Sequence, residues 1–159
     1  QNSQNRADLH NYDNQGRVIT HTQQKSDGSQ TITTQYTYDK NGNKCSETTQ
    51  MPGGAKITTK YAYDELNRLK TTTEGILTNS TGTSTAGKTT TYVYDKNNNL
   101  KSQTDWRKNS YTNKYDPLNR LIEKKDPNGK TIEKLTYNNN NVQITAKDAL
   151  GNITVIWTL

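Results

Sequence analysis

Aspartates are the residues of this chain whose type and spacing first suggest chemistry, because they recur directly after tyrosines. Five such pairs lie along the sequence: Tyr12-Asp13, Tyr38-Asp39, Tyr63-Asp64, Tyr94-Asp95 and Tyr115-Asp116. Two carboxylates on opposite sides of a glycosidic bond can act as acid and base in its hydrolysis. Each of these aspartates, however, precedes turn-forming residues, where an Asp side chain hydrogen-bonds the backbone. We therefore predict a structural role for them and a protein that is not an enzyme.

Nucleophiles and metal ligands of other kinds are scarce. Cys45 is the single cysteine, so no intrachain disulfide can form, and His10 and His21 are the two histidines. A zinc site of cysteines and histidines needs more ligands at closer spacing. The segment 39–43 carries several oxygen donors, but it lacks the ligand spacing and terminal glutamate of a helix-loop-helix calcium loop. The sequence predicts no catalytic residues, no metal site and no cofactor.

Binding of carbohydrate is the sharpest chemical alternative. Aromatic rings can pack against sugar rings while polar side chains fix the orientation of the ligand. Trp106 and Tyr111 lie outside the repeated Tyr-Asp positions, so we keep them as candidate ligand-binding residues. The structural alternative is that they pack against the sheet or cover its end. For Trp157, in the apolar run 153–159, packing is the favoured interpretation.

The charge of the chain is basic, with a formal net charge of +6 at pH 7. Such a balance can attract nucleic acids or anionic glycans. Lysines and arginines are scattered here, and no run of five or six like charges occurs. We therefore expect a solvated polar surface and no nucleic-acid partner, with a polyanion site as the less favoured alternative. No apolar stretch is long enough for a membrane helix, so membrane insertion is not expected.

Low hydrophobicity argues against a single compact core. Hydrophobic residues make up 27% of the chain, compared with roughly 45–50% in an ordinary globular protein. The 10 tyrosines and 2 tryptophans can still bury large areas, and the abundant threonines favour strands. This composition favours an extended array in which each unit packs only against its neighbours.

An internal repeat supports that interpretation. The Tyr-Asp pairs and a sixth, altered pair at Tyr137-Asn138 recur every 21 to 31 residues. The residue three positions after each Asp or Asn is always Gly or Asn: Gly16, Gly42, Asn67, Asn98, Asn119 and Asn141, with Gly129 and Gly151 after two further aspartates. Both residue types tolerate positive φ, which the last position of a type I turn plus left-handed residue requires. Each repeat is therefore predicted to be a strand, a turn and a strand.

The flanks of these turns have the alternation of β-strands. Pairs such as Tyr36 and Tyr38, or Tyr61 and Tyr63, place two rings on one face of a sheet. No helical periodicity is present. The segment 75–88 (GILTNSTGTSTAGK) is rich in Ser, Thr and Gly and predicts a flexible insertion. The whole chain, 1–159, is expected to be one array of about six repeats from Tyr12.

These motifs resemble the tyrosine–aspartate (YD, or Rhs) repeat family. The segments 63–69 (YDELNRL) and 115–121 (YDPLNRL), the latter followed by 126–131 (DPNGKT), carry the resemblance most clearly. Members of that family include bacterial Rhs and wall-associated proteins, toxin complex subunits and teneurins. The resemblance implies β-hairpins wound into an extended, spiralling antiparallel sheet, of which this chain is an open piece too short to close a shell. It also implies a place in a secreted or cell-surface bacterial protein.

The prediction for function is thus a structural module of a toxin or adhesion protein, with a lectin-like module as the alternative. Its partners are expected to be neighbouring repeats of a longer parent chain, with carbohydrate and an edge-to-edge homodimer as further options. The chain begins with Gln1, so we expect a processed or excised piece. The predicted structural positions are Tyr38, Asp39, Gly42, Tyr63, Asp64, Asn67, Tyr94, Asp95, Asn98, Tyr115, Asp116 and Asn119.

Overall fold

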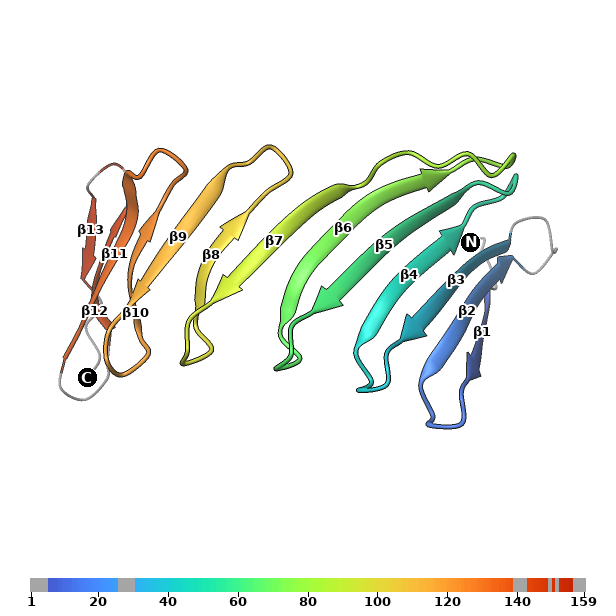
Figure 1. Cartoon of the computed structure of the whole chain (residues 1–159), viewed down its shortest axis with the longest axis horizontal. Coiled ribbons are helices and arrows are strands. Elements are labelled where there is room, and N and C mark those ends of the chain that lie inside the picture. The colour runs from blue at the N-terminus through green and yellow to red at the C-terminus, as the bar shows by residue number, and fades with distance from the viewer. Residues whose placement is uncertain (1–5, 26–30, 139–142, 149, 151, 156–159) are drawn as a thin grey trace, which may run out of the picture. The chain divides into compact units, whose positions relative to one another are not determined.

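The computed structural model describes residues 6–25, 31–138, 143–148, 150 and 152–155, and every regular element in these ranges is a β-strand (Figure 1). No helix in this part of the chain is long and apolar enough to cross a membrane. The chain divides into two compact units, 1–89 and 90–159. Each unit is built from antiparallel hairpins that follow one another in chain order, which confirms the predicted all-β repeat architecture.

The first unit contains six strands that pair as successive neighbours. They are β1 (Arg6–Tyr12), β2 (Val18–Lys25), β3 (Thr31–Tyr38), β4 (Lys44–Gln50), β5 (Lys56–Tyr63) and β6 (Leu69–Thr78). Each is antiparallel to the next. The register shifts by one residue just before the tyrosine that ends β1, β3 and β5. The tyrosine therefore pairs with the first residue of the strand that follows the turn.

The second unit continues the same pattern. Its strands are β7 (Lys88–Tyr94, in this unit from residue 90), β8 (Leu100–Thr104), β9 (Ser110–Tyr115), β10 (Leu121–Lys125), β11 (Thr131–Tyr137), β12 (Gln143–Asp148) and β13 (Ile153–Val155). Every consecutive pair is antiparallel. Turns alternate between the two ends of the strands, so Tyr-Asp turns lie at one end and the other turns lie at the opposite end.

One five-residue turn joins most of the strands. In the turn that begins at Asp64, the Asp64 N–H donates to the Arg68 carbonyl (2.9 Å) and the Asn67 N–H donates to the Asp64 carbonyl (3.0 Å). Asn67 has a φ of 59°, the left-handed conformation that the Gly/Asn column predicts. The same two bonds occur in turns beginning at Asp13, Asp39, Met51, Asp95, Asn79, Asp105, Asp116 and Asp126.

Three of these turns do not belong to the repeated Tyr-Asp column. The turns at Met51, Asn79 and Asp105 do not follow a tyrosine, and they lie at the opposite end of the strands from the Tyr-Asp turns. In the turn at Asp105, the left-handed position is held by Lys108, with φ of 70°. Lysine does not signal such a position in a sequence, which is why this turn escaped the pattern.

The segment 75–88 is more regular than its composition suggests. Its first four residues complete β6, and a turn follows at Asn79. Beyond this turn, the Thr85 N–H donates to the Leu77 carbonyl (2.8 Å), and Ser84 forms a bridge with Thr78. The segment thus extends a hairpin. The flexibility expected from its composition stays a prediction.

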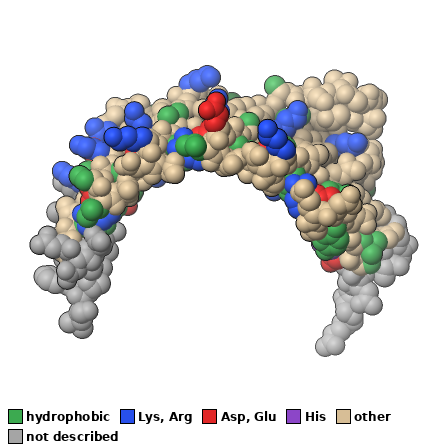
Figure 2. All heavy atoms as spheres, turned by 60° about the horizontal axis from the view of Figure 1, so that its bottom comes forward, with side chains coloured by type: hydrophobic (Ala, Val, Ile, Leu, Met, Phe, Trp, Pro, Cys, Tyr) green, Lys and Arg blue, Asp and Glu red, His purple; other side chains and the backbone are tan. Residues whose placement is uncertain are grey.

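Hydrophobic burial is slight. Among the described residues only Leu135 and Thr72 are buried, at 7% and 6% exposure. On the face shown in Figure 2, hydrophobic side chains form small, separate areas between polar ones. Hydrogen bonds between threonines on paired strands, such as Thr34–Thr49 (3.1 Å) and Thr48–Thr58 (3.0 Å), take part of the place of a core.

The left-handed Lys108 generates a stability prediction. Lys108→Gly should raise the free energy of unfolding by about 1 kcal/mol, because Cβ crowds the backbone at positive φ. The Tm should rise by about 2–4 °C in thermal unfolding followed by circular dichroism. Asn119→Val is the matched opposite change, since Asn119 has φ of 61° and valine is costly there. Equal Tm values for the two variants would contradict the turn assignment.

Candidate functional site

The aspartate that starts each Tyr-Asp turn is held by internal hydrogen bonds. Asp64 Oδ1 accepts from the backbone N–H groups of Leu66 (2.9 Å) and Arg68 (3.0 Å). Its other oxygen, Oδ2, accepts from Arg68 Nε (2.8 Å) and forms an ion pair with Nη2 (2.7 Å). The Arg68 side chain and these backbone donors lower the pKa of the Asp64 carboxyl below its ordinary value. The Asp64 carboxylate is therefore an anion that stabilises, or braces, its own turn by accepting these hydrogen bonds.

Two forms of this brace occur. In the Arg form, at Asp13/Arg17, Asp64/Arg68 and Asp116/Arg120, the guanidinium of the fifth turn residue pairs with the aspartate. In the Asn form, at Asp39/Asn43, Asp95/Asn99 and Asp105/Asn109, an amide donates to the carboxylate at 3.0 Å instead. We call these Arg-type and Asn-type turns. The two forms differ in what their fifth residue can offer to the neighbouring hairpin.

The tyrosine at the end of β3, β5, β9 or β11 connects its hairpin to the preceding one. Its hydroxyl donates to a backbone carbonyl at the start of the second strand of the preceding hairpin. The bonds are Tyr38 to Val18 (2.8 Å), Tyr63 to Lys44 (3.1 Å), Tyr115 to Leu100 (3.1 Å) and Tyr137 to Leu121 (2.6 Å). Burial raises the pKa of Tyr63 and of Tyr137. The sequence indicates that these rings share a face, but it does not reveal that their hydroxyls donate across hairpins.

The fifth turn residue adds a second connection. In the Arg-type turn at Asp13 the guanidinium lies over the tyrosine ring of the next hairpin, with Arg17 Cζ 4.6 Å from the centre of the Tyr38 ring. Arg120 lies over Tyr137 in the same way, at 4.5 Å. Such cation–π contacts contribute about 0.5–1 kcal/mol at exposed sites. The Arg-type turns at Asp13 and Asp116 therefore each connect their own aspartate to the following hairpin.

Asn-type turns use a different acceptor. Asn43 Nδ2 donates to Asn67 Oδ1 of the next Tyr-Asp turn (2.9 Å), and Asn99 does the same to Asn119 (2.9 Å). Asn41 Nδ2 also donates to Asn67 Oδ1 (2.8 Å). Asparagine in the left-handed position thus has a second role beyond tolerating positive φ. This role was missed because it depends on which turns lie side by side.

A lysine on β4 also contacts tyrosine rings on the two neighbouring strands, β3 and β5. Lys44 Nζ lies 5.6 Å from the centre of the Tyr36 ring and 5.0 Å from that of Tyr61. Glu47 accepts from the same ammonium at 2.7 Å. The hydrogen bond to Glu47 raises the pKa of Lys44. Tyr36 and Tyr61, the first tyrosines of their alternating pairs, therefore act through their ring faces.

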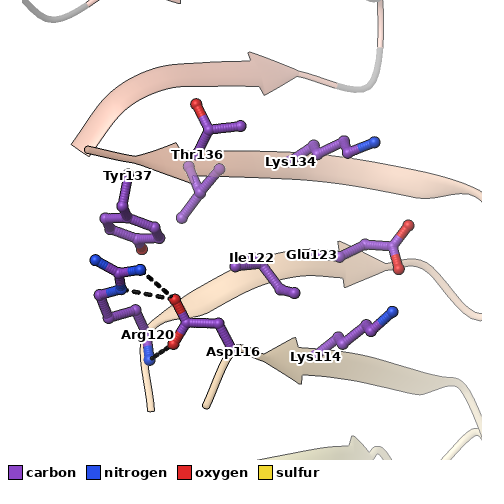
Figure 3. A pocket seen from close by; sticks show the side chains of 9 residues that line it. Lys114, Asp116, Arg120, Ile122, Glu123, Lys134, Thr136 and Tyr137 are labelled. Atoms are coloured by element: carbon purple, nitrogen blue, oxygen red, sulfur yellow. Dashed lines mark hydrogen bonds and ion pairs between the residues drawn. The ribbon is translucent and has the colours of Figure 1, made fainter. Parts of the chain in front are cut away.

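A pocket of about 430 Å³ lies in the second unit, over β9, β10 and β11 (Figure 3). Asp116, Arg120 and Tyr137 meet at one end of it, and Lys114, Glu123 and Lys134 lie toward the other. The Glu123 carboxylate accepts from Thr131 Oγ1 (2.7 Å), and that bond, with nearby lysines, lowers the pKa of Glu123. The two carboxylates that line the pocket are thus both held as hydrogen-bonded anions.

The structure places Trp106 and Tyr111 on one hairpin. Trp106 follows Asp105 at the tip of the β8–β9 turn and is 47% exposed; the guanidinium of Arg107 lies 4.7 Å from its ring. Tyr111 lies in β9 opposite Gln103 and is 38% exposed. One residue is on a turn and the other on a strand, and their role in binding stays a prediction. Trp157 lies outside the described residues.

Cysteine and histidine form no recognised metal site in the described ranges. Cys45 is half-buried, with Sγ 3.7 Å from the Asn43 carbonyl. His10 and His21 stack with ring centres 4.4 Å apart, and His21 Nε2 lies 3.0 Å from Asp8 Oδ1. The stacked pair occupies a cross-strand position on β1 and β2, so it contributes to the pairing of those strands.

Comparison with known proteins shows a shared fold. No family model and no curated protein matches the chain. The crystal structure of TcdB2-TccC3-Cdc42 is similar over 86% of this chain and 7% of that chain, with 17% identity and a TM-score of 0.63. The Photorhabdus luminescens Tc holotoxin pore gives 17% identity over 88% and 9% of the two chains, with a TM-score of 0.58. The crystal structure of TcdB2-TccC3-TEV is 14% identical to this chain, over 89% of this chain and 9% of that chain, with a TM-score of 0.51. The chain thus spans less than a tenth of these similar chains.

The lowered pKa of Asp64 predicts loss of stability in acid. A carboxyl whose folded pKa lies below its unfolded value stabilises the fold above that unfolded value, about pH 4, and stops doing so as the pH falls through the folded pKa. The Tm should therefore be nearly constant from neutral pH down to about pH 5 and fall below about pH 4.

Asp64→Asn is the variant that isolates this effect. Asn79 already starts a turn of the same kind, its Oδ1 accepting from the N–H groups of Thr81 and Thr83, so asparagine can keep the two backbone bonds. We expect a lower Tm at neutral pH, because the Arg68 pair is lost, and a smaller decrease in acid. An identical acid decrease in both proteins would show that Asp64 does not carry the effect.

Proposed function

We propose that this chain is a structural segment of the β-scaffold of a large secreted or cell-surface bacterial protein of the YD/Rhs repeat type, a toxin or an adhesion protein, without enzymatic activity. The observation that carries the proposal is the repeated hydrogen bond from a turn tyrosine to the backbone of the preceding hairpin. Such a bond serves to hold an array in register. It uses the single O–H donor of each of these tyrosines inside the array.

The distribution of buried residues supports this proposal. With so few buried side chains in the described ranges, stability has to come from contacts between neighbouring hairpins. The tyrosine hydroxyls, the arginines over tyrosine rings, the paired asparagines and the Lys44 contact are all of this kind. A module of this design gains stability from further copies on either side, which suits a part of a longer wall.

The similar solved structures also support the scaffold proposal. They are structures of a Tc holotoxin pore and of TcdB2-TccC3 proteins, and this chain matches less than a tenth of each. A short stretch of a much larger β-structure is what a scaffold segment would match. We propose an extracellular or cell-surface location on the same basis, with neighbouring repeats of the parent chain as partners.

The scaffold function predicts a specific loss on removing one hydroxyl. Tyr63→Phe deletes the bond to the Lys44 carbonyl and keeps the ring, so the free energy of unfolding should fall by about 0.5–1.5 kcal/mol. Chemical denaturation of the two proteins, followed by tyrosine fluorescence and circular dichroism, measures the difference.

Tyr61→Phe is the matched control on the same strand. Tyr61 contacts Lys44 through its ring face, which phenylalanine retains, so its stability should change much less. If Tyr63→Phe is as stable as the parent protein, the hydroxyl does not connect the hairpins, and the scaffold proposal loses the observation that carries it.

A lectin-like module is the second candidate, and the exposure of Trp106 and Tyr111 on the β8–β9 hairpin favours it. Exposed aromatic rings near polar side chains can receive a sugar ring. Arg107 and Lys108, beside Trp106, would add attraction for an acidic sugar.

A glycan array at low and high salt distinguishes the two candidates. Binding to a defined sugar that persists at high salt and disappears in Trp106→Ala would support the lectin function. Binding that disappears at high salt would reflect the net positive charge alone. Absence of binding under both conditions favours the scaffold.

A further inference from the structure

The first hairpin of the array, β1 with β2, presents an open edge. In the described ranges β1 pairs with β2 alone. Tyr12 ends β1 in the same register as the connecting tyrosines, since it pairs with Val18 as Tyr38 pairs with Lys44. Yet Tyr12 is 57% exposed, whereas Tyr38 and Tyr63 are half-buried against a preceding hairpin. The edge therefore has the chemistry of an inter-hairpin interface with one side uncovered.

The direction of β1 determines what kind of strand could cover it. Within the first unit, β3 is covered by β2, and β5 by β4. Both covering strands run antiparallel and begin directly after a Tyr-Asp turn. Only such a strand places its first carbonyl where the hydroxyl of the connecting tyrosine can reach it, as Val18 does for Tyr38.

The turn of the first hairpin also selects between Arg-type and Asn-type neighbours. An Asn-type neighbour donates to a side-chain oxygen in the left-handed position, as Asn43 does to Asn67. The corresponding residue here is Gly16, which has no side chain to accept. An Arg-type neighbour needs only the tyrosine ring and room beside the glycine: Arg17 stacks on Tyr38 and lies by Gly42, where a Cβ would be 4.0 Å from Nη1. A Cβ added to Gly16 would meet nothing within 4 Å, so the space beside this glycine is open to the arginine of a neighbouring hairpin.

We propose that the edge of β1 is a docking surface for a β-hairpin of the same kind whose aspartate turn is Arg-type, with Tyr12 and Gly16 as the residues that select it. This inference rests on the proposed scaffold function and specifies the neighbour that the scaffold accepts. The strand adds to the sheet edge by main-chain hydrogen bonds, and the turn supplies the specificity.

The test uses the full chain and a synthetic probe. The probe is a backbone-cyclised, fluorescently labelled hairpin of residues 6–25, because its β2 edge already covers Tyr38 and Gly42 in this protein. Binding to the 159-residue chain is measured by fluorescence anisotropy. We expect the Arg17→Asn probe to bind roughly 2- to 5-fold more weakly, the range that corresponds to losing a cation–π contact of about 0.5–1 kcal/mol.

Variants of the chain test the two selecting residues. Gly16→Asn supplies an acceptor at a position where asparagine tolerates the positive φ, so it should improve binding of the Arg17→Asn probe and reduce the difference between probes. Tyr12→Phe keeps the ring and loses the hydroxyl, so it should weaken both probes by a similar factor. No binding of either probe, equal affinity for both, or no response to Gly16→Asn would overturn the proposal.

A second copy of the chain is the competing occupant of this edge. Sedimentation velocity of the chain alone detects it: a dimer that excludes the probe would overturn the proposal in favour of pairing between two β1 edges. The scaffold function is tested separately by Tyr63→Phe. If Tyr63→Phe is destabilising and the probes fail to bind, only the docking inference is wrong.

Discussion

The hydrogen bond from a turn tyrosine to the backbone of the preceding hairpin is the interaction on which the rest of this structure depends. A hairpin alone is marginally stable in water, and a chain with few apolar residues cannot compensate by forming a deep core. The tyrosine at the end of β3 or β5 reaches sideways to the neighbouring hairpin with both its ring and its hydroxyl. It thereby converts separate hairpins into an array, and its exposure at Tyr12 marks an uncovered edge.

The aspartate has to be understood together with that tyrosine. Its carboxylate accepts backbone N–H groups and thus shapes the turn that places the fifth residue beside the next hairpin. Arg17 and Arg120 stack on the tyrosine of the next hairpin, whereas Asn43 and Asn99 donate to the asparagine of the next Tyr-Asp turn. A single turn geometry therefore supports two kinds of connection. The lowered pKa of Asp13, Asp39 and Asp64 follows from this bracing and requires no catalytic role.

Candidate ligand-binding features lie apart from this network. Trp106 and Tyr111 belong to a hairpin whose turn, at Asp105, is at the opposite end of the strands from the Tyr-Asp turns. Side chains there are not needed to connect hairpins through tyrosine hydroxyls, so they can differ between repeats. An array connected at its Tyr-Asp end therefore tolerates different residues in the turns at the other end without loss of its architecture.

The hairpins, the Tyr-Asp turns and their left-handed positions could be predicted from the residues alone, because turn chemistry is local and the Gly/Asn column records it directly. The sequence did not reveal the turn at Asp105, since Lys108 adopts positive φ without belonging to a residue type that signals it. The bonds from Tyr63 to Lys44 and from Asn43 to Asn67 were decided by tertiary structure alone. They join residues that lie far apart in the chain, and only the packing of one hairpin against the next brings donor and acceptor together.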